Sequence, residues 1–97
     1  MVARELLAAP VEAVVANHCY GMFELAALHL AQQPPNLEAA RTAIDAMGLV
    51  VEGLGARLGE HATTLEDGLT QVRLAWVKIA ETGPAPDPRA EPAGGPA

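Results

Sequence analysis

Hydrophobic residues recur at intervals of three and four along three stretches of the chain, and proline or glycine separates these stretches. This spacing places apolar side chains on one face of a helix. Runs that alternate apolar and polar residues, as half-buried strands do, do not occur. We therefore expect an all-α protein with helices over about residues 10–33, 37–58 and 64–82, and a short leading helix before Pro10.

The first predicted helix is apolar over more than half of its circumference. Pro10 suits its first turn, where the missing N–H has no helical partner anyway, and Pro34 and Pro35 end it. A helix this apolar is usually sandwiched between partners. Its candidate core or interface residues are Val15, His18, Met22, Leu25 and His29.

The second predicted helix carries a heptad repeat. Leu37, Ile44, Val51 and Leu58 recur every seven residues, with Ala40, Met47 and Leu54 between them. Such a seam is typical of antiparallel bundles and coiled coils. The candidate core residues here are Ile44, Met47, Val51 and Leu54, and Asn36 is a suitable N-cap.

Three glycines, Gly48, Gly53 and Gly55, lie inside this second helix, where each costs about 1 kcal/mol relative to alanine. Close approach of a neighbouring helix is the simplest explanation. A hinge or a notch for a ligand is the alternative. Gly59 suits the C-terminal end of the helix.

The third predicted helix begins with a capping box of Thr63 and Glu66. Its apolar stripe supplies the candidate core residues Leu69, Val72 and Trp76, whereas Leu74 and Val77 indicate a second contact surface. The helical domain should span residues 1–82, and the Pro/Gly/Ala-rich residues 83–97 should form a disordered tail. We expect a three-helix antiparallel bundle that leaves surplus apolar surface, which homodimerisation would cover.

The chain is acidic, with 12 Asp and Glu against 6 Lys and Arg and a formal net charge of −6. The basic residues are scattered, whereas phosphate binding needs a basic patch, so direct nucleic-acid binding is not expected. The sequence contains no stretch of about 18 uncharged apolar residues, so we do not expect a membrane span. The single cysteine, Cys19, excludes an intramolecular disulfide and favours a reducing cytoplasm.

The run from His18 to His29 also raises the question of a reactive site, because it holds two of the three histidines and Cys19. The two histidines are about three helical turns, or 16 Å, apart, which is too far to share one metal ion. Adjacent residues such as His18 and Cys19 do not face each other on a helix. We therefore predict no catalytic residue, no metal and no cofactor.

The run "NLEAARTAIDAMGLVVEGLGARLGEHATTLEDGLTQVRLAWVKIA", residues 36–80, resembles a bacterial family of small helical proteins, domain of unknown function eighteen forty-four. The Leu-Glu-Ala-Arg-x-x-Ile-Asp order and the "LEDGLTQVRLAW" segment carry the resemblance, which covers roughly residues 11–80. The resemblance implies a helical protein without an established activity. It also implies a link to translation, because actinobacterial members tend to be encoded beside ribosomal-protein and initiation-factor genes.

These observations predict a non-enzymatic helical module for self-association, as a dimer, or for binding another protein. The alternative is a small regulatory bundle that binds a ligand or metal in a glycine notch lined by His18, His29 or His61.

Overall fold

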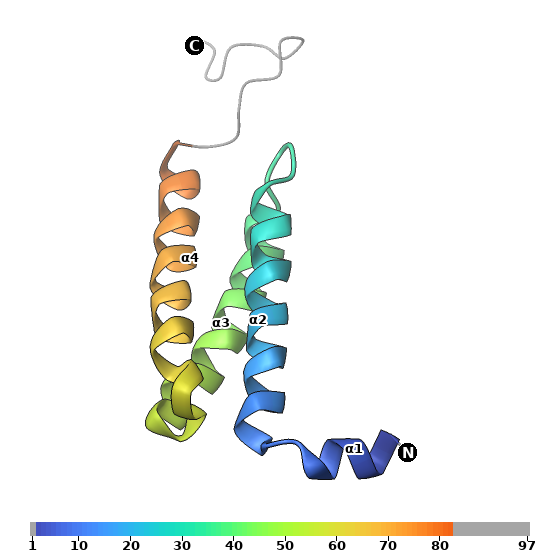
Figure 1. Cartoon of the computed structure of the whole chain (residues 1–97). Coiled ribbons are helices and arrows are strands. Elements are labelled where there is room, and N and C mark those ends of the chain that lie inside the picture. Colours follow the sequence, from blue (N-terminus) through green and yellow to red (C-terminus); the bar gives the residue numbers. More distant parts are fainter. Residues whose placement is uncertain (1, 83–97) are drawn as a thin grey trace, which may run out of the picture.

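The computed structural model describes residues 2–82, which form an all-α protein with three helices packed against one another. These are α2 (Val11–Leu30), α3 (Leu37–Leu54) and α4 (Ala62–Thr82), and a short 3₁₀ segment, η1 (Gly55–His61), joins α3 to α4. Successive helices run in opposite directions, so that α2 and α4 point the same way (Figure 1). The all-α prediction is thus confirmed, while the predicted tail at 83–97 lies outside the described residues.

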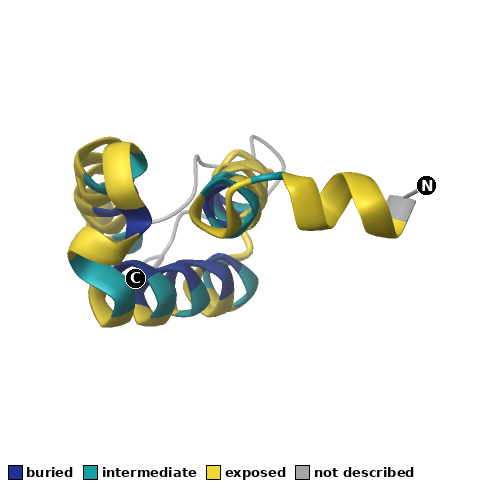
Figure 2. Ribbon diagram, turned by 60° about the horizontal axis from the view of Figure 1, so that its bottom comes forward, coloured by how far each residue is buried: buried dark blue, intermediate teal, exposed yellow. Residues whose placement is uncertain are grey.

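The buried face of α2 consists mostly of small residues. Ala16, Cys19 and Ala26 are fully buried, and Leu30 is nearly so. Small side chains let neighbouring helices approach closely, which removes the backbone of α2 from water along this stripe. Figure 2 shows the buried residues of α2 and α3 turned toward each other, with exposed residues outside.

Helix α3 begins as the sequence predicts, but it ends earlier. The Asn36 side chain accepts a hydrogen bond from the Ala39 N–H at 3.0 Å, which confirms the N-cap. The helix stops at Leu54 rather than Leu58 because Gly55 takes a positive φ of 53°, a conformation that ends a helical run and favours glycine. The heptad repeat nevertheless extends to Leu58, which is fully buried in η1.

Helix α4 begins at Ala62, directly after η1. Thr63 is therefore inside the helix and not at its cap, so the predicted capping box with Glu66 is wrong. The change of direction comes from Gly59, which has a φ of 64° within η1. Leu65 and Leu69 then point into the core that α3 forms with α2.

The short helix α1 (Val2–Ala8) stands apart from the three packed helices. It projects from the base of α2 on the side away from α4 (Figures 1 and 2). Leu6 and Leu7 are 54% and 87% exposed, so the rest of the described chain leaves both leucines of α1 largely uncovered. Within residues 2–82, none of the helices has the length and apolar character needed to cross a membrane.

An ion pair between Arg73 and Glu52 links α4 to α3. Arg73 Nη1 donates to Glu52 Oε2 at 2.8 Å, and Nη2 donates to Oε1 at 3.3 Å. Gly48 makes this geometry possible, since a Cβ there would lie 2.5 Å from Arg73 Nη2. Close approach therefore explains Gly48, although the group that approaches is the side chain of Arg73 and not the backbone of a neighbouring helix. It does not explain Gly53, where a Cβ would meet nothing within 4 Å.

We predict that Glu52→Gln lowers the melting temperature slightly at pH 7 and not at all at strongly acidic pH. The Arg73 hydrogen bond and charge lower the pKa of Glu52, so the carboxylate favours the folded state above its ordinary pKa. That contribution is lost as the pH falls through the lowered pKa of the folded state. Thermal melts of both proteins from pH 7 to 2 measure the difference, and a gap that persists at the acidic end would contradict the assignment.

Candidate functional site

The potentially reactive residues His18 and Cys19 face in different directions. His18 is exposed, whereas the adjacent Cys19 is fully buried among the core residues. Burial raises the pKa of the Cys19 thiol, because desolvation disfavours the thiolate. Since the thiolate is the nucleophile, Cys19 acts in this fold as a small apolar core residue.

The other two histidines have separate surroundings. The Tyr20 hydroxyl lies 3.2 Å from His61 Nδ1, and their rings meet edge to face with centroids 5.9 Å apart. This contact ties α2 to η1. His29 is half-buried, and its Nδ1 is buried without a hydrogen-bond partner. Among residues 2–82, no three His, Cys, Asp or Glu side chains come together as a metal site requires.

The structure divides the twelve candidate residues of the sequence into three groups. Five are buried, and they are Ile44, Met47, Val51, Leu69 and Val72. Five are half-buried, and they are Val15, Met22, His29, Leu54 and Trp76. His18 and Leu25 are exposed, so they are not part of the core that one chain forms. On α2 the core lies about one residue, or 100°, further round the helix, at Cys19 and Ala26.

Trp76 connects α4 to the start of α3. Its indole Nε1 donates a hydrogen bond to the Leu37 carbonyl at 2.8 Å, and the Arg41 guanidinium lies 5.8 Å from its ring centroid. A buried indole N–H needs such a partner. Trp76 therefore stabilises the contact between the two helices.

The side of α2 that faces away from the core carries an uncovered apolar surface, which we call the outward face. Its residues are Val11, Val14, His18, Gly21, Leu25 and Leu28, of which Val14 is half-buried and the other five are exposed. They form two series with a spacing of seven, Val11–His18–Leu25 and Val14–Gly21–Leu28, which together make a coiled-coil seam. Val11 is 73%, Leu25 49% and Leu28 62% exposed. The core or interface candidates predicted from the sequence include His18 and Leu25 of these six.

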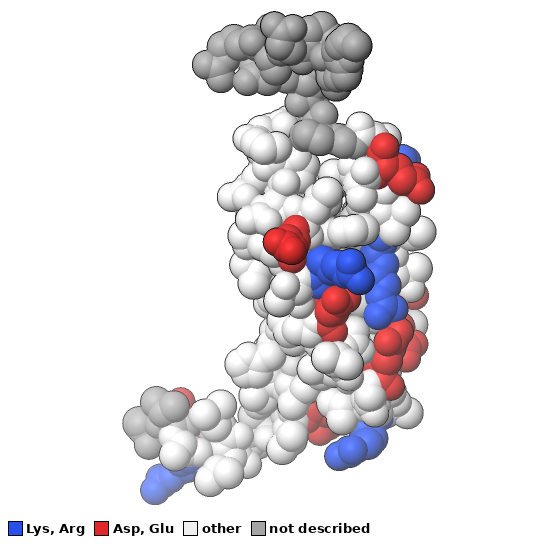
Figure 3. All heavy atoms as spheres, turned by 180° about the vertical axis from the view of Figure 1, so that it is seen from behind, with Lys and Arg blue, Asp and Glu red and all other residues white. Residues whose placement is uncertain are grey.

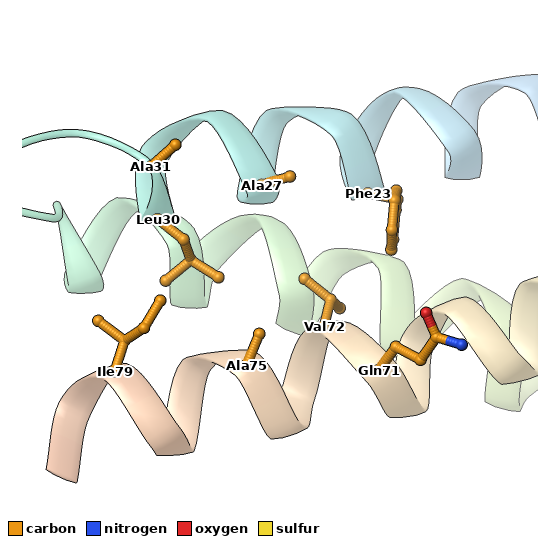
Figure 4. Close-up of a pocket in the computed structure, with 8 residues that line it drawn as sticks. All are labelled: Phe23, Ala27, Leu30, Ala31, Gln71, Val72, Ala75 and Ile79. Atoms are coloured by element: carbon orange, nitrogen blue, oxygen red, sulfur yellow. The ribbon is translucent and has the colours of Figure 1, made fainter. Parts of the chain in front are cut away.

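A second unfilled surface is a groove of about 360 Å³ between α2 and α4. Helix α2 contributes Phe23, Ala27, Leu30 and Ala31, and α4 contributes Gln71, Val72, Ala75 and Ile79. Leu30 and Ile79 point toward each other at one end, whereas the short side chains of Ala27 and Ala75 leave the middle open (Figure 4). The lining is almost wholly apolar, so this groove suits an apolar side chain and not a charged substrate.

Charged residues avoid both surfaces. The only formally charged residues of α2 are Glu12 and Glu24, and neither belongs to the outward face. The back of the molecule instead shows basic and acidic side chains interspersed over α3 and α4 (Figure 3). Depletion of charge together with exposed apolar residues characterises the centre of a protein–protein interface.

Comparison with known proteins found no match: no family model, no curated protein and no solved structure is similar to the chain. The resemblance to domain of unknown function eighteen forty-four therefore stays a prediction from the sequence.

We predict that the Cys19 thiol of the folded protein is at least about a hundredfold less reactive toward a soluble thiol reagent at pH 8 than in the unfolded chain. Its full burial blocks access, and its raised pKa reduces the thiolate fraction. Reaction rates with and without denaturant measure this ratio. Equal rates would show that Cys19 is accessible and would reopen the question of a nucleophile.

Proposed function

We propose that this protein is a non-enzymatic helical module that self-associates through the outward face of α2. The observation that carries the proposal is the seam from Val11 to Leu28, in which every residue but the half-buried Val14 is exposed. One chain leaves it open to water, and burying apolar area is the main favourable contribution to association.

The spacing along the seam is complementary to itself. When two copies of α2 run antiparallel around a two-fold axis between His18 and Gly21, Val11 faces Leu28 and Val14 faces Leu25. His18 then faces Gly21. Each layer thus pairs a larger side chain with a smaller one, and the pairing is the same in both directions, as a two-fold interface requires. This match favours a second copy over an unrelated partner.

The proposed pairing also accounts for Gly21. A glycine in the middle of a helix costs about 1 kcal/mol relative to alanine. Within the described chain, a Cβ at Gly21 would meet nothing within 4 Å, so no intrachain contact requires a glycine there. In the paired helices its missing side chain leaves room for the imidazole of His18 from the second copy.

Charge is consistent with self-association despite the net charge of −6. The six residues of the outward face carry no formal charge when His18 is neutral. Repulsion between the remaining carboxylates acts over longer distances, and physiological salt screens it.

The ligand- or metal-binding alternative gains less support. The groove between α2 and α4 is lined by none of the three histidines and by none of the α3 glycines. This groove is therefore not the histidine-lined notch of that alternative. A link to translation rests on the family resemblance alone and stays a prediction.

The first test replaces an outward-face leucine with a charged residue. We expect the wild type to sediment as a dimer at micromolar concentration, and Leu25→Glu to raise the dimer dissociation constant about tenfold or more, because a carboxylate would face Val14 of the second copy. Leu49→Glu is the matched control, since Leu49 is 78% exposed on α3. A monomeric wild type, or equal effects of the two variants, would refute the proposal.

The second test uses the two helical glycines that have free space around them. Gly21→Gln and Gly53→Gln should each raise the stability of the monomer by up to about 1 kcal/mol, because glutamine is the better helix former. Only Gly21→Gln should also weaken association, since its side chain would collide with His18 of the second copy. Thermal melts and sedimentation of the same samples separate these effects. Unchanged association in Gly21→Gln would exclude the crossing at this residue.

A further inference from the structure

We infer that the groove between α2 and α4 receives α1 of a second copy, with Leu6 or Leu7 over Ala27 and Ala75. In this exchange α1 is an arm that each copy places on the other. The exchange rests on the proposed self-association and adds a second contact to it. Two unsatisfied surfaces motivate the inference, namely the exposed leucines of α1 and the open middle of the apolar groove.

Helix α1 is too short to reach the groove of its own chain. The groove begins at Phe23 and extends to Ala31, and these residues lie about 20 and 32 Å along α2 from Pro10. Helix α1 has seven residues and is about 10 Å long, and it starts at the opposite end of α2. The arm of the same chain therefore cannot reach this groove.

The proposed pairing brings the arm of the other copy to the end of the molecule where the groove lies. When Val11 of one copy faces Leu28 of the other, the chain before Val11 emerges beside Leu30 and Ala31. These two residues line the groove. Helix α1 also projects on the side of α2 away from α4 (Figure 1). If α2 of the second copy lies on that side, two-fold symmetry directs its arm back across α2 toward α4.

Charges at the edges of the arm and of the groove are complementary. On α1, Arg4 and Glu5 lie on opposite sides of the Leu6–Leu7 face, at about 100° per residue. Beside the groove, Glu24 precedes Ala27 by one turn on α2, and Lys78 follows Ala75 by one turn on α4. Both rim residues are exposed. Arg4 can therefore approach Glu24, while Glu5 approaches Lys78.

A cross-linking experiment tests the exchange directly. One full-length chain carries Leu7→Cys and another carries Ala75→Cys, both in a Cys19→Ala background, and the mixture is oxidised at micromolar concentration. We expect a covalent heterodimer of twice the 10.0 kDa chain mass. Leu7→Cys mixed with Glu60→Cys is the matched control, because Glu60 lies in η1 at the other end of the bundle. This control should give at most about a tenth of that product.

Sedimentation of the same mixtures separates the two proposals. A non-covalent dimer without the Leu7–Ala75 cross-link would overturn the arm exchange alone, and an occupant such as the tail of the same chain or a bound apolar molecule would give this result. A monomer would overturn both proposals.

A charge exchange in the native background provides a second test, should a cysteine variant fail to fold. Arg4→Glu and Glu24→Arg should each weaken the dimer about threefold, and the double variant should restore it. Additive losses in the double variant would contradict the proposed contact.

Discussion

The arrangement of this protein depends on the close packing of α2 against its neighbours through small side chains. Ala16, Cys19 and Ala26 are fully buried, and they allow the helix backbone to approach the core. Because these residues face inward, the bulkier Leu25 and Leu28 face outward. The same helix therefore supplies both the core contact and the exposed seam, and the surplus apolar surface is a direct consequence of which face is buried.

The second open surface arises in a similar way. Ala27 and Ala75 lie where α2 and α4 pass each other, and their short side chains do not fill the space between the helices. Leu30 and Ile79 close only one end. A bundle of three helices in a chain this small has few residues with which to cover such openings, and association with a second copy is the common solution.

Sequence reasoning succeeded where a single face of a helix was apolar. In α3, the heptad pattern identified Ile44, Met47 and Val51, and all three are buried. In α2, by contrast, hydrophobicity alone could not tell which of His18 and Cys19 faces inward, because that helix is apolar on nearly every side. The distinction depends on side-chain size at a tertiary contact, which a pattern of apolar positions does not encode.

The hydrophobic pattern also did not predict where α3 ends, and it did not predict the groove between α2 and α4. Gly55 and Gly59 are both suitable helix stops, and both take a positive φ, yet the heptad pattern continued past the first to Leu58. The groove could not be predicted, because its open middle lies between Ala27 and Ala75, which are about 50 positions apart in the sequence. In contrast, the Asn36 cap was predictable, since its hydrogen bond is local.

The central claim is that two copies pair antiparallel through the outward face of α2. An isotope-filtered nuclear Overhauser experiment on an equal mixture of labelled and unlabelled protein tests it most directly, because it detects only contacts between copies. The account predicts intermolecular contacts between the methyl groups of Leu25 and Val14 and between those of Leu28 and Val11. A dimer that shows no intermolecular contact at these four residues, or a protein that stays monomeric at the millimolar concentrations of the experiment, would contradict it.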